Sequence, residues 1–132
     1  MYTMKEVCEK TGFTYETLKF YCIEGLIPNV KRDKNNRRIF DDYNLNWIKS
    51  LQCLKNCELS IAEMKKYLEL CLEGVETIPE RKIMLEKKQV ALRERIKNLQ
   101  EAINFIDWKQ NLYDDILSGK IEYKSDLTPP KD

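Results

Sequence analysis

The sequence predicts a mainly α-helical protein with one short β-hairpin and a long coiled-coil helix near the C-terminus. Three observations lead to this fold class. Capping residues and glycines divide the first 25 residues into two short helices. A basic stretch around Asn35-Asn36 then has the composition of a hairpin. Finally, apolar residues recur at heptad spacing from Leu85 to Leu117.

The composition narrows the class of function. The chain has 132 residues, of which 34% are charged and 42% apolar, enough for one folded core and an extension. It has no histidine, which excludes histidine-dependent catalysis and histidine metal sites. It also has no Cys-x-x-Cys motif, no glycine-rich phosphate loop and no apolar run that could cross a bilayer. Its five cysteines fit a reducing compartment better than a disulfide framework. We therefore expect a cytoplasmic protein that is not an enzyme and needs no cofactor, metal or membrane.

The first two helices form a helix-turn-helix candidate. Thr3 can cap a first helix that Gly12 ends, and Thr14 can cap a second helix over about 15–24 that Gly25 ends. Two short helices joined by a tight turn are found in many helical hairpins, and also where a second helix enters the major groove of DNA. The expected major-groove contacts are Tyr15, Glu16, Lys19 and Phe20.

A basic hairpin is expected directly after these helices. Residues 30–40 carry five Lys or Arg side chains and one acidic side chain, Asp33. Asn35-Asn36 tolerates positive φ and suits a tight turn. After a helix-turn-helix, such a hairpin is a wing whose cations neutralise phosphates beside the groove, although a hairpin that faces only solvent is the alternative. The expected wing contacts are Lys31, Arg32, Arg37 and Arg38.

A third helix is expected over about 43–56, with Asp41 or Asp42 as its cap. Its apolar residues fall within a narrow arc at 100° per residue, so that arc is expected to line the core. The arc consists of Tyr43, Trp47, Leu51 and Leu54, with Ile48 at its rim.

Two further capping boxes mark the helices that follow. Ser60 and Glu63 form the first box, which begins a fourth helix that Gly74 ends. Thr77 and Glu80 form the second box and begin the last helix. The sequence therefore predicts a helical pair between the hairpin and the heptad region.

The heptad region predicts a dimerisation helix. Eight of its ten seam positions are apolar, and the polar positions Gln89 and Gln110 favour one register. About 40 helical residues span roughly 60 Å, which a domain of about 75 residues cannot cover. A second copy of the same helix is the simplest partner, and a helix folded back on its own chain is the alternative. The expected dimer contacts are Leu85, Leu92, Ile96, Leu99, Ile103, Ile106 and Tyr113.

The expected organisation has three parts. Residues 1–75 form a winged-helix DNA-binding domain, residues 76–117 a coiled-coil dimerisation helix, and residues 118–132 a short irregular tail. This organisation predicts a homodimer that binds double-stranded DNA. The alternative is a helical interaction protein that docks a partner through its coiled coil and does not bind DNA.

The motifs together resemble those of the MerR-type bacterial transcription regulators. The resemblance lies in residues 1–7, 17–21, 25–28 and 38–40, and it extends over residues 1–117. It implies a winged-helix homodimer joined by an antiparallel coiled coil, which binds a pseudo-palindromic operator in promoter DNA. It also implies that the protein distorts this DNA, and so acts on RNA polymerase indirectly.

The chain departs from the family pattern at several positions. Lys19 stands where the family commonly has arginine, and Asn36-Arg37 stands where the family's wing has glycine followed by an aromatic residue. Longer members carry a drug-binding domain after the coiled coil, for which we expect no room here. Metal-sensing members use cysteines in the long helix and beyond, whereas residues 78–132 contain none. We therefore expect no metal site of that kind.

Cys53 is the candidate sensor. It lies off the apolar arc of its helix, with Lys49 one turn before it and Cys57 one turn after it. The surrounding segment resembles the small MerR branch that responds to aldehydes and other electrophiles, which keeps a cysteine at this position. A spare interface or core thiol is the alternative. A Cys53–Cys57 disulfide is disfavoured because an intact helix strains that bond.

Overall fold

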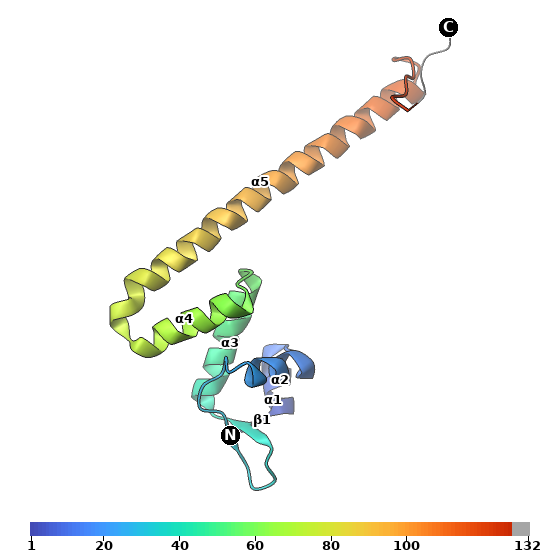
Figure 1. The fold of residues 1–132 in the computed structure, drawn as a ribbon. Helices are drawn as coiled ribbons and strands as arrows, with labels where there is room; N and C mark the ends of the chain where they lie inside the picture. The colour runs from blue at the N-terminus through green and yellow to red at the C-terminus, as the bar shows by residue number, and fades with distance from the viewer. Residues whose placement is uncertain (128–132) are drawn as a thin grey trace. The chain divides into compact units, whose positions relative to one another are not determined.

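The computed structural model describes residues 1–127, so the predicted irregular end at Pro129-Pro130 lies outside the described residues. Contacts within the chain divide it into two compact units, of which the first runs from Met1 to Gln89 and the second begins at Val90. The elements of the first unit, together with the long helix, are shown in Figure 1. In order they are β1 (Tyr2–Thr3), α1 (Met4–Thr11), α2 (Tyr15–Ile23), β2 (Lys31–Arg32), β3 (Arg38–Phe40), α3 (Asp42–Asn56), α4 (Ile61–Glu73), the 3-10 turn η1 (Val75–Thr77) and α5 (Ile78–Leu117).

The predicted hairpin is present and gains a further strand from the N-terminus. Within the described residues, β2 and β3 pair antiparallel, with Lys31 opposite Ile39. β1 pairs with the other edge of β3, with Tyr2 opposite Phe40, so the sheet order is β1-β3-β2. A strand of two residues has no periodicity to reveal it, because its role depends on a partner far along the chain.

Local caps begin the short helices as the sequence predicts. Thr3 and Glu6 form a reciprocal capping box at the start of α1, with two hydrogen bonds of 3.1 Å. Thr14 caps α2 by accepting the N–H of Thr17. Gly12 ends α1 with a φ of 80°, in the left-handed region that a residue with a Cβ rarely adopts.

The hydrophobic core lies in the first unit and joins the helices to the sheet. Its fully buried members come from different elements, so each of these elements buries one apolar face against the others. The largest are Phe40, Leu18, Leu26, Ile48, Leu51 and Met64. Met84, from the beginning of α5, also packs against this core.

The predicted core face of α3 is confirmed at Leu51 and Leu54, which are buried, and at Trp47, which packs against the core, but it is wrong at Tyr43. Tyr43 is 86% exposed, whereas Ile48, expected at the rim, is fully buried. The difference arises from the hydrogen bonds of Asn44. Its side chain forms a reciprocal capping box with Asp41 at the start of α3, and it also donates to the carbonyl of Pro28 at 2.9 Å. Asn44 is therefore buried with all these bonds satisfied, and it turns Tyr43 outward.

The last helix begins directly after Thr77 as predicted, but Thr77 and Glu80 do not form the predicted capping box, whereas the box formed by Ser60 and Glu63 is confirmed. The Thr77 hydroxyl donates to the carbonyl of Leu70 and accepts from Arg81 Nε at 2.9 Å. The 3-10 turn η1 leads directly into α5, so Thr77 does not stand at a free helix start. Its hydroxyl instead joins the end of α4 to the start of α5.

α5 is a continuous helix of 40 residues, none of which is buried (Figure 1). The tail from Ser118 to Leu127 forms turns and bends. In the part of the chain that the structure describes, no helix combines the length and the apolar character that crossing a membrane requires. The proposed functional boundaries at residues 75 and 117 stay a prediction.

We predict that Ile48→Ala will lower the free energy of unfolding by about 2–5 kcal/mol, because it removes a fully buried side chain and leaves a cavity. Tyr43→Ser is the matched control, and its effect should stay within about 0.5 kcal/mol because Tyr43 is exposed. Urea denaturation of both variants measures the difference. A larger loss from Tyr43→Ser than from Ile48→Ala would contradict the observed core face of α3.

Candidate nucleic-acid interface

α2 presents an exposed face that carries the four predicted groove residues. Its opposite face is held in the core by Leu18 and Tyr21, and the rings of Tyr21 and Phe13 pack edge to face with their centroids 5.5 Å apart. The exposed side chains on the other side of α2 are that of Ile23, which was not predicted as a contact, and those of the four predicted groove residues, Tyr15, Glu16, Lys19 and Phe20. Two are aromatic and two are charged, so the face offers both apolar contacts and hydrogen-bonding groups.

The turn of the wing is organised by Asp33. One oxygen of its carboxylate accepts the N–H groups of Asn35 and Arg37, both at 2.9 Å. Asn36 has a φ of 61°, as a tight hairpin turn requires, and its carbonyl accepts from Arg32 at 2.9 Å. The acidic side chain of the wing therefore shapes the turn that carries the cations.

A cleft of about 480 Å³ lies between the N-terminus of α1, α2 and the wing. It brings Tyr15 together with three predicted wing cations, which are Arg32, Arg37 and Arg38. Lys19, Glu16, Phe20 and Lys31 are exposed but do not line this cleft. Arg38 is half-buried, whereas Lys31, Arg32 and Arg37 are exposed.

The cleft also contains Lys5, which sequence analysis missed. Lys5 lies in the first turn of α1, where an exposed lysine has no distinguishing pattern. Lys5 comes to the cleft because the pairing of β1 with β3 places the wing beside the start of α1. With Lys5, four cationic side chains line the cleft against one carboxylate, that of Asp33. Such a surface attracts phosphate groups.

The five cysteines differ in their exposure. All five thiols are free, and all lie within the described residues. Cys53 is exposed, while the other four are half-buried. Burial raises the pKa of the Cys8 and Cys22 thiols, and both residues pack against the core as expected. Within residues 1–127 there is no group of three metal-ligating side chains that could hold an ion.

The predicted seam of α5 is exposed along almost its whole length. Leu92 is half-buried, and six other predicted contacts are exposed, namely Leu85, Ile96, Leu99, Ile103, Ile106 and Tyr113. α5 also exposes Phe105 and Trp108, whose rings lie 6.2 Å apart. At 100° per residue these two fall on the side opposite the seam, and the sequence analysis did not assign them.

Comparison with known proteins identifies the family. The model of the MerR helix-turn-helix family of regulatory proteins matches residues 2–71, more than half of the chain. The chain belongs to this family. A helix-turn-helix transcriptional regulator from Haemophilus influenzae is 37% identical over 112 residues, which cover 85% of this chain and 83% of the relative. The regulator AdhR from Bacillus subtilis is 36% identical over 89 residues, 67% of this chain and 64% of AdhR.

A solved structure supports the same assignment. HiNmlR, a MerR family regulator that lacks the sensor domain and was crystallised with promoter DNA, is similar with a TM-score of 0.71 and 35% identity. The similarity covers 89% of this chain and 93% of that one. The predicted family, fold class and function as a DNA-binding transcriptional regulator are confirmed. The alternative of an interaction module that does not bind DNA is not supported.

We predict that Asp33→Ala will weaken DNA binding about threefold to tenfold, the equivalent of one net hydrogen bond. The predicted loss of affinity distinguishes a structural role from an electrostatic one, because removing a negative charge beside phosphates would by itself strengthen DNA binding. Asp33→Asn is the matched control: it keeps an oxygen that can accept the two N–H groups and should bind DNA more tightly. Fluorescence anisotropy with a labelled duplex measures both affinities. Equal strengthening in both variants would show that Asp33 does not organise the wing.

Proposed function

We propose that the chain acts as a homodimer on promoter DNA, with α2 in the major groove and the wing on the flanking phosphates. The cleft that joins Tyr15 to Arg32, Arg37 and Arg38 is the observation that carries this proposal. In it, one side chain expected to enter the groove lies beside three cations that can bind the flanking phosphates. The remaining groove contacts are Glu16, Lys19 and Phe20, and the remaining wing contact is Lys31.

The homodimer is formed through α5. The seam side chains are exposed in a single chain, and several are large and aliphatic, as Leu99 and Ile103 are. Contiguous exposed apolar surface of this kind marks an interaction site. A second copy of α5 buries the seam with matching heptads, and regulators of this family act as dimers.

The dimer regulates transcription through the shape of the DNA. Phosphate contacts hold the flanks of the operator, while the cost of bending depends on base pairs that the protein does not touch. The protein therefore acts on RNA polymerase indirectly, by changing the geometry of the promoter. We propose that it works in the cytoplasm, where the DNA is, and that it catalyses no turnover.

We predict that the double variant Leu99→Glu, Ile103→Glu will be monomeric and will bind DNA far more weakly. Two carboxylates at a buried seam cost several kcal/mol. Light scattering should give twice the chain mass of 15.8 kDa for the wild type and one chain mass for the variant. Gel shifts on the protein's own upstream region at increasing salt should show a steep loss for the wild type. A monomeric wild type that binds as tightly as the family's dimers would refute the proposal.

Cys53 is the proposed sensor of electrophiles. Its exposure distinguishes it from the four half-buried thiols. With an aldehyde, the sulfur adds to the carbonyl carbon, a carbon–sulfur bond forms, and the proton moves from sulfur to the carbonyl oxygen. The added group lies at the C-terminal part of α3, whose cap is Cys57. The adduct shifts the equilibrium between operator-bound states when one of these states accommodates the added group better than the other does.

We predict that Cys53→Ala will keep operator affinity and lose induction by aldehydes. Cys57→Ala is the matched control one turn later, at the C-cap of α3, and should respond as the wild type does. A promoter reporter challenged with an aldehyde measures induction, and gel shifts measure affinity. Unchanged induction in Cys53→Ala removes Cys53 from the mechanism, and a loss confined to Cys57→Ala assigns sensing to the other thiol.

A further inference from the structure

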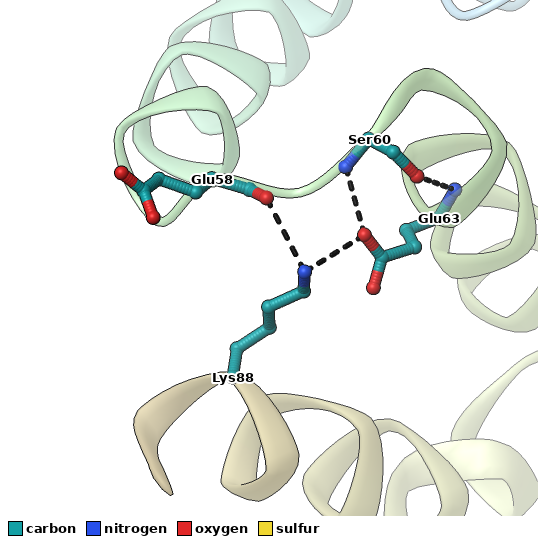
Figure 2. A network of polar contacts seen from close by, with 4 residues as sticks. All are labelled: Glu58, Ser60, Glu63 and Lys88. Atoms are coloured by element: carbon teal, nitrogen blue, oxygen red, sulfur yellow. Dashed lines mark hydrogen bonds and ion pairs between the residues drawn. The ribbon is translucent and has the colours of Figure 1, made fainter. Parts of the chain in front are cut away.

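Lys88 of α5 is held at the connection between α3 and α4, as Figure 2 shows. Its ammonium lies 2.8 Å from Glu63 Oε1 and donates to the carbonyl of Glu58 at 3.3 Å. Glu63 Oε1 also accepts the N–H of Ser60 at 2.9 Å, and Ser60 Oγ accepts the N–H of Glu63. One ammonium therefore meets the turn after α3 and the first turn of α4 at the same time.

The two groups that Lys88 contacts are themselves fixed. Glu58 has a φ of 65°, a left-handed conformation in a residue other than glycine, so its carbonyl direction is set by the turn. The Glu63 carboxylate is held by the capping box, and the Lys88 ammonium is the main reason that its pKa is lowered. The Lys88 side chain is 25% exposed. Because both acceptor oxygens are held in place, the Lys88 ammonium is fixed in its direction as well as in its distance from each of them.

The place of this contact along α5 gives it a role beyond stability. Ion pairs that are partly exposed add little to the free energy of folding. Lys88, however, stands directly before Gln89, the last residue of the first unit, and α5 continues from there as the same helix to Leu117. The contact thus acts at the point where the helix leaves the DNA-binding unit.

We propose that Lys88 is a positioning residue, which fixes the start of α5 on the α3–α4 turn and thereby determines the half-site separation that the dimer prefers. The inference rests on the proposed homodimer. Two DNA-binding units joined through α5 have a separation and a relative rotation that depend on how each α5 is anchored. One base pair changes the spacing of half-sites by about 3.4 Å and rotates one half-site by roughly a tenth of a turn. A rigid anchor therefore makes the dimer selective for one spacing.

The test uses full-length dimers and a duplex that the wild type selects from a random-sequence pool. The half-site separation of this duplex is then kept, or changed by one or two base pairs. Lys88→Met keeps the aliphatic stem and removes the charge. Glu63→Gln keeps a side chain that can complete the capping box and removes the ion pair. Lys88→Arg restores a cation at the position.

The wild type should prefer its selected spacing, and Lys88→Met and Glu63→Gln should lower that preference about fivefold, the lower end of typical coupling between sites. Their affinity for a single half-site should not change, and Lys88→Arg should recover the preference. An equal loss of affinity at every spacing, or a preference that stays unchanged while the melting temperature falls, overturns the inference and leaves Lys88 a structural residue. A wild type that is monomeric in light scattering overturns the proposed homodimer, and this inference with it.

Discussion

Two hydrogen bonds from α3 hold the segment that joins α2 to the wing. This segment has no regular structure of its own, so its buried carbonyls need partners from elsewhere. Asn44 Nδ2 donates to the carbonyl of Pro28 at 2.9 Å, and Trp47 Nε1 donates to the carbonyl of Leu26 at 2.7 Å. The direction in which the chain leaves α2 and enters β2 depends on these bonds. Without them the cleft between α2 and the wing would lose its fixed shape.

The separation of bonded residues along the chain explains where sequence reasoning succeeded. The caps at Thr3, Thr14 and Ser60 each involve residues within three positions, so short motifs predict them correctly. The core-facing arc of α3 was predicted from apolar residues alone and therefore included Tyr43. In the structure Tyr43 is exposed, and the neighbouring side chain of Asn44 is buried. A buried polar residue with satisfied bonds leaves no mark in an apolar periodicity.

The residue types of the candidate site follow from the sequence, but their assembly does not. The exposed face of α2, the wing cations and the order of these elements follow from local patterns, and their roles as DNA contacts stay a prediction. That Lys5 joins them, that Lys88 meets Glu63, and that Thr77 joins Leu70 to Arg81 all depend on segments that fold together from a distance. Likewise, helical angles separate Cys53 from the core arc, but only the folded chain shows that the other four thiols are half-buried.

The N-terminal strand has a practical consequence for protein production. Thr3 is at once the end of β1 and the cap of α1, and Tyr2 pairs with β3 and donates its hydroxyl to Asp42 at 2.7 Å. Trimming the chain by three residues would therefore remove a strand, a helix cap and a bond to α3 in one cut. A purification tag fused ahead of Met1 would begin next to the sheet that carries the wing. Tags for binding assays belong at the other end of the chain.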